Sequence, residues 1–202
     1  MTDTVTTYPH LDRPERFTAA QIGWVPWLTP LPVEEFTDRH WAGVVDRSRA
    51  ASPYFALLAR DPEILAARTT TDKDIFYNTT GGLPRAEREL AATATSRENG
   101  CVFCASVHAR FAGHYAKRTD DVQLLLDEGV TAPLDERWSA IVAASVALAA
   151  TPVRFSAEHI HRLRAAGLED SEIIDVINGS SFFNWANRLM LSLGEPENPA
   201  EG

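Results

Sequence analysis

The stretch Glu98-Asn99-Gly100-Cys101-Val102-Phe103-Cys104-Ala105-Ser106-Val107-His108 holds both cysteines of the 202-residue chain and marks a boundary between two helices. An Asn-Gly pair commonly ends a helix, because both residues tolerate the left-handed conformation of a C-terminal cap. We therefore expect one helix to end near Asn99. A second helix is expected to begin near Cys101 and to run to about Lys117.

The helical pattern continues on both sides of this boundary. The helix before it is expected to open at Leu83-Pro84, since proline is favoured in a first turn. No run of residues alternates between apolar and polar with period two, as a half-buried strand would. The sequence therefore predicts an all-α fold. Further helices are expected over residues 33–50, 120–128, 134–150, 156–166 and 171–193, with one or two short helices over 53–67 broken at Asp61-Pro62.

The chain divides into three parts by composition. Residues 1–20 are polar and are expected to form an N-terminal arm, and residues 21–194 a single all-helical domain. Residues 195–202 are acidic and contain prolines, which predicts a disordered tail. The segment 21–32 contains Trp24 and Trp27 between prolines. We interpret these tryptophans as anchors on the domain or on a neighbouring subunit.

The charge balance argues against two classes of partner. The formal net charge is −9 and the pI about 5.1, so no basic face is expected to bind nucleic acid or an anionic membrane surface. The N-terminus has no pattern of a signal peptide, and no apolar run reaches the roughly 20 residues needed to cross a bilayer. A cytoplasmic location is the expectation. In that reducing compartment a C-x-x-C is more often catalytic or metal-bound than structural.

The C-x-x-C lies where a helix can activate thiols. At about 100° per residue, Cys101, Cys104 and His108 fall within roughly 60° of one another. Unpaired N–H groups and the macrodipole of the first turn stabilise a thiolate. The imidazole can hold or pass a proton. Either Glu89 or Glu98 could orient it, and the spacing does not choose between them.

Two readings of the motif without redox catalysis stay open. Cys101, Cys104, His108 and Glu89 could be ligands of a structural zinc ion, although such sites usually draw ligands from two separated knuckles and only one is present. The cysteines could also be two small buried hydrophobic residues.

The stretch Leu83-Pro-Arg-Ala-Glu-Arg-Glu-Leu, followed by Asn-Gly-Cys-Val-Phe-Cys-Ala-Ser-Val-His, resembles the AhpD-like alkylhydroperoxidase branch of the carboxymuconolactone decarboxylase family. Its signature is a glutamate, then C-x-x-C, then a histidine four residues on. The matching residues are Glu89, Cys101, Cys104 and His108. A similarity to peroxidase-related proteins extends from the Trp24 segment to the stretch 182–188.

The resemblance implies an all-helical homo-oligomer that reduces hydroperoxides without a cofactor. Cys104 would attack the peroxide, and Cys101 would resolve the resulting sulfenic acid as a disulfide. Glu89 and His108 would move protons, and an external dithiol would restore both thiols. Phe103 departs from the family, which often has histidine there. A thiol redox sensor and a lactone decarboxylase-like enzyme are the alternatives, the latter disfavoured because such decarboxylases generally lack the cysteine pair.

Overall fold

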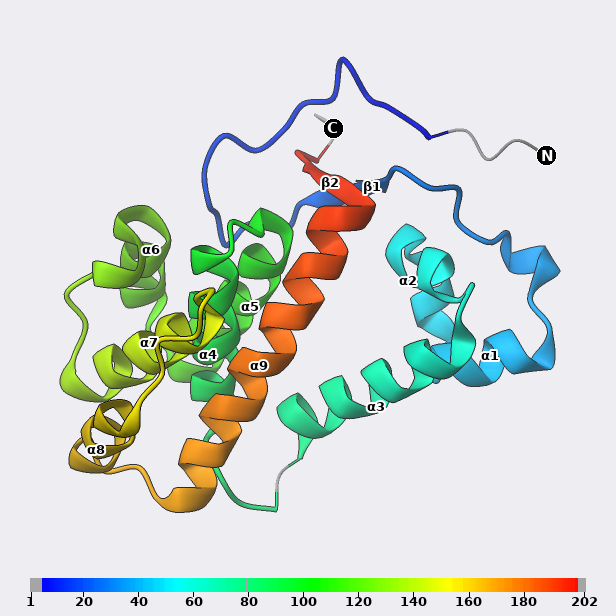
Figure 1. The fold of residues 1–202 in the computed structure, drawn as a ribbon. Coiled ribbons are helices and arrows are strands. Elements are labelled where there is room, and N and C mark those ends of the chain that lie inside the picture. The colour runs from blue at the N-terminus through cyan, green and yellow to red at the C-terminus, as the bar shows by residue number, and fades with distance from the viewer. Residues whose placement is uncertain (1–4, 79, 200–202) are drawn as a thin grey trace.

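The computed structural model describes residues 5–78 and 80–199 and shows a mostly helical protein (Figure 1). The predicted all-α fold class is confirmed, with short 3-10 turns at Val33–Glu35, Arg47–Ala51 and Gly129–Thr131. The helices are α1 (Asp38–Val44), α2 (Pro53–Leu58), α3 (Pro62–Tyr77), α4 (Arg85–Glu98), α5 (Val102–Ala116), α6 (Thr119–Glu128), α7 (Glu136–Ala149), α8 (Ala157–Ala165) and α9 (Asp170–Leu193). Two short strands, β1 (Gly23–Pro26) and β2 (Gly194–Glu197), complete the fold.

Helix α4 lies at the centre of the molecule and packs against α5, α7 and α9 (Figure 1). Its residues Leu90, Ala91 and Ala94 are fully buried, and Ile141 of α7 is buried with them. Alanine side chains allow close approach of helix axes. The same helix also buries the charged residue Glu89, and a buried charge requires a partner inside the protein.

Helix α3 is longer than the sequence predicts. We expected helix only to about Ala67, because several threonines follow, but α3 continues to Tyr77. Threonine has a low helix propensity, which tertiary packing can override. Here Arg68, Thr69 and Phe76 are buried on one side of the helix. In contrast, the predicted helix over residues 33–50 is broken after Val44, where Val45 has a φ of 65°.

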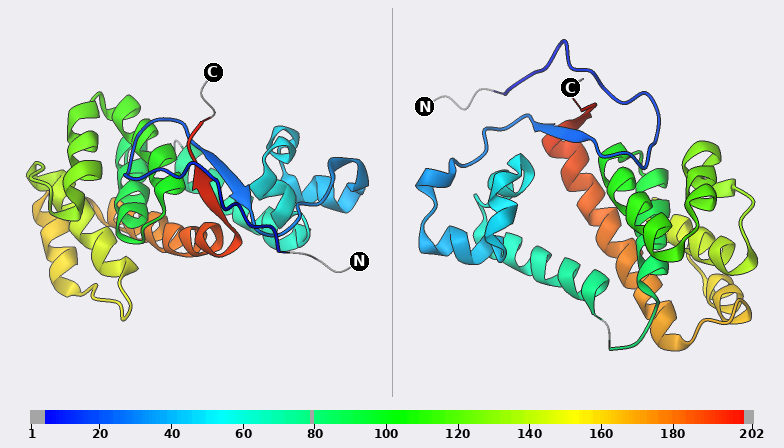
Figure 2. Two further views of the ribbon diagram at one scale, coloured as in Figure 1. Left: turned by 90° about the horizontal axis from the view of Figure 1, so that it is seen from above. Right: turned by 180° about the vertical axis from the view of Figure 1, so that it is seen from behind.

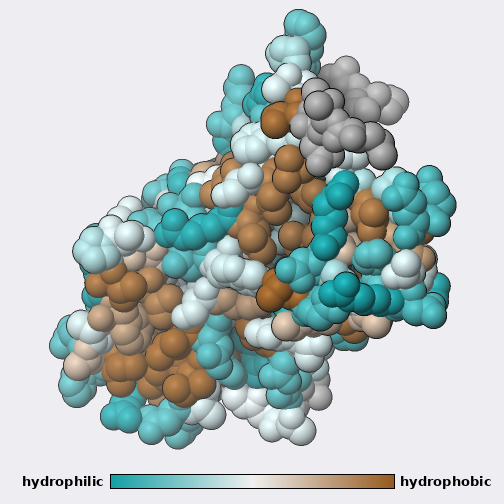
Figure 3. All heavy atoms as spheres, turned by 45° about the vertical axis from the view of Figure 1, so that its right-hand side comes forward, coloured by the Kyte–Doolittle hydropathy of each residue, from teal (hydrophilic) through white to brown (hydrophobic). Residues whose placement is uncertain are grey.

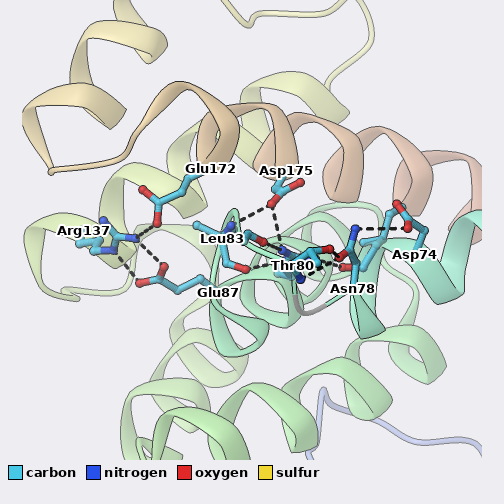
Figure 4. A network of polar contacts seen from close by, with 11 residues as sticks. Asp74, Asn78, Thr80, Leu83, Glu87, Arg137, Glu172 and Asp175 are labelled. Atoms are coloured by element: carbon cyan, nitrogen blue, oxygen red, sulfur yellow. Dashed lines mark hydrogen bonds and ion pairs between the residues drawn. The ribbon is translucent and has the colours of Figure 1, made fainter.

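A polar network fixes the start of α4 against α7 and α9 (Figure 4). Asp175 of α9 accepts a hydrogen bond from the backbone N–H of Leu83 at 2.8 Å and pairs with Arg88 at 3.1 Å. Arg137 of α7 donates to both carboxylate oxygens of Glu87, at 2.7 and 2.8 Å. These contacts hold the first two turns of α4 in place, and with them the direction in which Glu89 points.

The prediction of a disordered tail is wrong for residues 195–197, which lie in β2. This strand pairs antiparallel with β1, with Trp24 opposite Pro196. Glu195 binds Arg13 at 2.6 Å and accepts from Trp27 Nε1 at 3.3 Å. Four-residue strands containing glycine or proline show no readable alternation, so only the pairing across the fold defines them. Residues 200–202 of the predicted tail lie outside the described residues.

The N-terminal segment runs beside the two strands (Figure 2). The Thr6 N–H donates to the Trp27 carbonyl at 2.9 Å, and Asn198 N–H donates to the carbonyl of Asp12 at 2.8 Å. Residues 1–4 of the predicted arm lie outside the described part. Trp24, interpreted from sequence as an interface anchor, is buried within the chain and packs edge-on against Tyr54 at 5.6 Å.

The surface is mixed in character. On the side where α1 to α3 come forward, hydrophobic residues reach the surface in the middle of the face, bordered by hydrophilic ones (Figure 3). Within residues 5–78 and 80–199, no helix is both long enough and apolar enough to span a bilayer.

Candidate functional site: a buried dithiol beside an arginine-lined cavity

The two cysteines lie at the junction of α4 and α5, as the sequence predicts. Asn99 caps the C-terminus of α4, and Cys101 is the N-cap residue of α5. Gly100 between them has a φ of 78°, a conformation that costs glycine little and other residues more. Both cysteines are free thiols, with Cys101 2% and Cys104 7% exposed. The turn therefore sets two reduced sulfurs at the start of a helix.

The two thiols hydrogen-bond to each other, and this divides their acidity. The Cys104 S–H donates to the sulfur of Cys101, which lowers the pKa of Cys101 despite its burial; the Cys104 backbone N–H lowers it further. The same sulfur–sulfur contact and burial raise the pKa of Cys104. When one of the two thiols ionises, the negative charge therefore forms first on Cys101, at the helix N-terminus.

Glu89 and His108 form a buried pair next to the thiols. Nδ1–H of His108 donates to Glu89 Oε2 at 2.5 Å, and Glu89 is only 1% exposed. The other carboxylate oxygen, Oε1, accepts from Arg85 Nε at 2.6 Å. Because Nδ1 is committed to Glu89, Nε2 is the ring nitrogen available to accept a proton. A carboxylate oriented by arginine therefore orients the imidazole.

The second candidate acid, Glu98, is placed elsewhere. Its carboxylate lies 3.8 Å from Arg154, and it does not line the cavity that contains His108. Two aromatic rings also hold the imidazole of His108. Phe76 stacks on it at 5.0 Å between centroids, and Phe183 meets it edge-on at 4.1 Å. The sequence left open whether Glu89 or Glu98 pairs with His108, and the packing of α3, α4, α5 and α9 places Glu89 against it.

A cavity of about 340 Å³ opens beside these groups and is lined by residues of α2, α3, α4, α5 and α9. Cys104, His108 and Glu89 all contribute to its wall. Cys101 instead lines a separate pocket of about 20 Å³. A molecule that enters the larger cavity therefore meets Cys104 first. The position of the cavity thus favours Cys104 for contact with a bound molecule, whereas the pKa directions favour Cys101 as the first thiol to ionise.

Three residues of this site were not in the predicted set. Arg85 could have been found from its i,i+4 spacing to Glu89 on the helix. Asn187 lies on α9, far along the chain from the C-x-x-C, where sequence spacing gives no signal. Its Nδ2 donates to Ser96 Oγ at 3.0 Å, and its amide lowers the pKa of both thiols. The third, Arg68, lies on α3 and carried no signal in the sequence.

The zinc alternative is not supported by a ligand cluster. Within the described ranges 5–78 and 80–199, no three His, Cys, Asp or Glu side chains are grouped in the manner of a metal site. Glu89 and His108, two of the four ligands considered, are hydrogen-bonded to each other.

The thiol pair gives a prediction for alkylation by iodoacetamide across a pH series. The Cys104→Ala substitution removes the S–H donor that lowers the pKa of Cys101, so the pH midpoint for Cys101 alkylation should rise. The Cys101→Ser substitution removes the neighbouring charge that raises the pKa of Cys104, so that midpoint should fall. Two shifts in the same direction, measured by mass spectrometry, would contradict the opposite effects of the two thiols on each other's pKa.

These features define a class of protein: an all-helical AhpD-like fold with a buried C-x-x-C dithiol beside a Glu–His pair. Residues 62–147 match the model of the carboxymuconolactone decarboxylase family. This stretch includes α4, α5 and all four predicted site residues. The family resemblance stated from the sequence is therefore confirmed. No curated protein matches the chain.

Solved structures share the fold at low sequence identity. An AhpD-core, peroxidase-related protein from Ralstonia eutropha JMP134 has a TM-score of 0.69 at 21% identity, covering 84% of this chain and 92% of that one. A peroxidase-related protein from Silicibacter sp. TM1040 has a TM-score of 0.66 at 21% identity, covering 95% of both chains. The debrominase Bmp8 has a TM-score of 0.65 at 17% identity, covering 81% and 88%.

Proposed function

We propose that this protein is a thiol-dependent peroxidase that reduces organic hydroperoxides through a dithiol–disulfide cycle of Cys104 and Cys101. The observation that carries the proposal is the wall of the cavity. One sulfur of a C-x-x-C and an imidazole oriented by a buried carboxylate line the same space. A small oxidant in this space can meet a nucleophile and a proton-transfer group together.

In the first step, Cys104 acts as the nucleophile. Its proton passes to Nε2 of His108, while the Glu89 carboxylate stabilises the imidazolium that forms. The thiolate attacks the terminal oxygen of the hydroperoxide, and the O–O bond breaks. Cys104 becomes a sulfenic acid, and the alkoxide that leaves takes a proton from His108 to become the alcohol.

In the second step, Cys101 resolves the sulfenic acid. The lowered pKa of Cys101 supplies a second thiolate within the hydrogen-bonded pair. It attacks the sulfur of Cys104, and the S–S bond forms as the S–O bond of the sulfenic acid breaks. The leaving hydroxyl takes the proton that Cys101 released, relayed by His108, and departs as water. An external dithiol then reduces the disulfide by thiol exchange and is itself oxidised.

The setting of this cycle completes the proposal. A reducing dithiol is available in the cytoplasm, so the proposal includes a cytoplasmic location. The proposal also includes a homo-oligomer. It includes no resident cofactor, because the two thiols supply both electrons that reduce the hydroperoxide. The net charge of −9 disfavours nucleic acid and anionic membranes as partners. The rival role is a redox sensor, which would be oxidised without turning over.

Stoichiometric oxidation tests the cycle. One equivalent of cumene hydroperoxide should convert the reduced protein to a form with no titratable thiols, and release one equivalent of cumyl alcohol. Intact-mass analysis should show the loss of two hydrogens, and peptide mapping should show a Cys101–Cys104 disulfide. Excess dithiothreitol should then support repeated turnover.

Each possible failure has a different meaning. A protein that gains oxygen without forming a disulfide would contradict the resolving role of Cys101. Oxidation that dithiothreitol reverses only once, without sustained consumption of hydroperoxide, would favour the sensor. A protein that keeps both thiols in the presence of hydroperoxide would overturn the proposal.

A further inference from the structure

The cavity beside Cys104 contains a buried arginine with unused hydrogen-bond donors. Arg68 is 9% exposed, and its guanidinium lies over the rings of Tyr54, Phe55 and Phe182 at 5.9, 5.4 and 5.4 Å from their centroids. Its Nε has no hydrogen-bond partner among the residues that the structure describes, and its Nη1 makes no hydrogen bond there but lies 3.4 Å from a carboxylate oxygen of Asp72. Burying such donors without partners costs stability unless a ligand uses them.

Two further donors lie on the same wall. The hydroxyl of Tyr54, which is 6% exposed, also lacks a hydrogen-bond partner within the described residues. Nη1 of Arg49 makes no hydrogen bond there either, although it lies 3.6 Å from a carboxylate oxygen of Asp72. Burial raises the pKa of Tyr54 to about 12, with Arg68 partly opposing the effect. The phenol therefore keeps its proton at neutral pH and can donate it.

The charges in the cavity do not balance. Arg49, Arg68 and Arg85 face only Asp72 and Glu89 among the acidic residues of the lining. Arg85 is committed to Glu89, and Asp72 is shared between Arg49 at 3.6 Å and Arg68 at 3.4 Å. One positive charge is left over in a protein whose net charge is −9. A buried positive charge favours an anion.

We propose that Arg68, Tyr54 and Arg49 form a carboxylate-binding subsite, and that the substrate is a small organic hydroperoxide with an apolar body and a carboxylate. That the ligand carries a hydroperoxide group rests on the proposed peroxidase function. That it carries a carboxylate rests on the hydrogen-bond donors of Arg68, Tyr54 and Arg49. Phe76, Phe103 and Phe183 on the same cavity wall would contact the apolar body. The carboxylate accepts from the guanidinium groups and the phenol while the hydroperoxide faces Cys104.

A competing role for Arg68 is to stabilise the thiolate. The guanidinium acts on Cys104 by charge and lowers its pKa, although burial and Cys101 dominate in the opposite direction. A residue with this role alone would speed the reaction of charged and neutral hydroperoxides equally. A carboxylate subsite instead distinguishes between them, so the ratio between two matched ligands is the informative quantity.

Binding of two unreactive ligands to the reduced full-length protein tests the subsite. In isothermal titration calorimetry, 4-isopropylbenzoate should bind at least about tenfold more tightly than the uncharged 4-isopropylbenzamide, the difference expected for one charge-assisted hydrogen bond. Arg68→Met should remove this preference, and Tyr54→Phe should reduce it. Arg162→Met, which removes the same charge from an exposed position on α8, should leave it unchanged.

Turnover gives the second readout. For 4-(2-hydroperoxypropan-2-yl)benzoate against cumene hydroperoxide, kcat/KM should favour the carboxylate by a similar factor, and the ratio should approach one in Arg68→Met. Equal affinity for the acid and the amide, or a preference kept in Arg68→Met, would overturn the subsite. If Arg68→Met does not fold, the wild-type comparison and Tyr54→Phe decide. Carboxylate binding without turnover would instead overturn the peroxidase function and leave the subsite standing.

Discussion

Replacing Cys104 by serine should lower kcat/KM for cumene hydroperoxide by at least about 10³-fold, because the substitution removes the only thiol that lines the larger cavity within the described residues. Serine keeps the size of the side chain, and Cys104 is 7% exposed, so the fold should change little. A coupled assay with dithiothreitol as reductant measures the loss. Far-UV circular dichroism and the thermal midpoint show whether the variant is folded.

The matched variant Cys101→Ser separates the two thiols. It keeps the attacking sulfur and removes the resolving one, so the first oxidation should proceed and then stop at the sulfenic acid. A dimedone probe should label Cys104 in this variant and leave Cys104→Ser unlabelled. Labelling of Cys101 in Cys104→Ser would reverse the two roles. Wild-type rates in Cys104→Ser would exclude this cysteine as the nucleophile.

The substitution Glu89→Gln should have the second-largest effect. It removes the carboxylate that orients His108 and stabilises the imidazolium, so turnover should fall by about 10² to 10⁴-fold. It also leaves Arg85, which is 20% exposed, without its charged partner. We expect a loss of about 2 kcal/mol in the free energy of unfolding, after allowing for this partial exposure. The thermal midpoint should fall by roughly 4–8 °C.

The matched control is Glu98→Gln, the same substitution at the other end of α4. The carboxylate of Glu98 pairs at 3.8 Å with Arg154 and is 31% exposed, so both turnover and stability should stay close to those of the parent. A larger loss of turnover in Glu98→Gln than in Glu89→Gln would show that the relay acid has been assigned to the wrong residue. A pH profile unaffected by Glu89→Gln would exclude the proposed relay.

Features that depend only on neighbours along one helix could be predicted from the sequence. Asn99 and Gly100 end α4, and α5 begins directly after Cys101, because cap preferences act over only a few residues. The 100° step of an α-helix was enough to predict that Cys104 and His108 lie on one side of α5. The predicted all-α fold class and the predicted helix boundary just before the C-x-x-C followed from these local rules.

The tertiary structure decided whatever depends on contacts between separate elements. Glu89 rather than Glu98 pairs with His108 because α4 and α5 pack side by side with Glu89 facing inward. Helix α3 extends to Tyr77 because burial of Phe76 outweighs the weak helix preference of threonine, and this extension helps to build the cavity wall. Residues 195–197 are ordered because β1 supplies their hydrogen bonds. The unpartnered donors of Arg68 could likewise not be predicted, because they result from the packing of α2 and α9 around this residue of α3. Burial and hydrogen bonding of a side chain depend on contacts between separate elements.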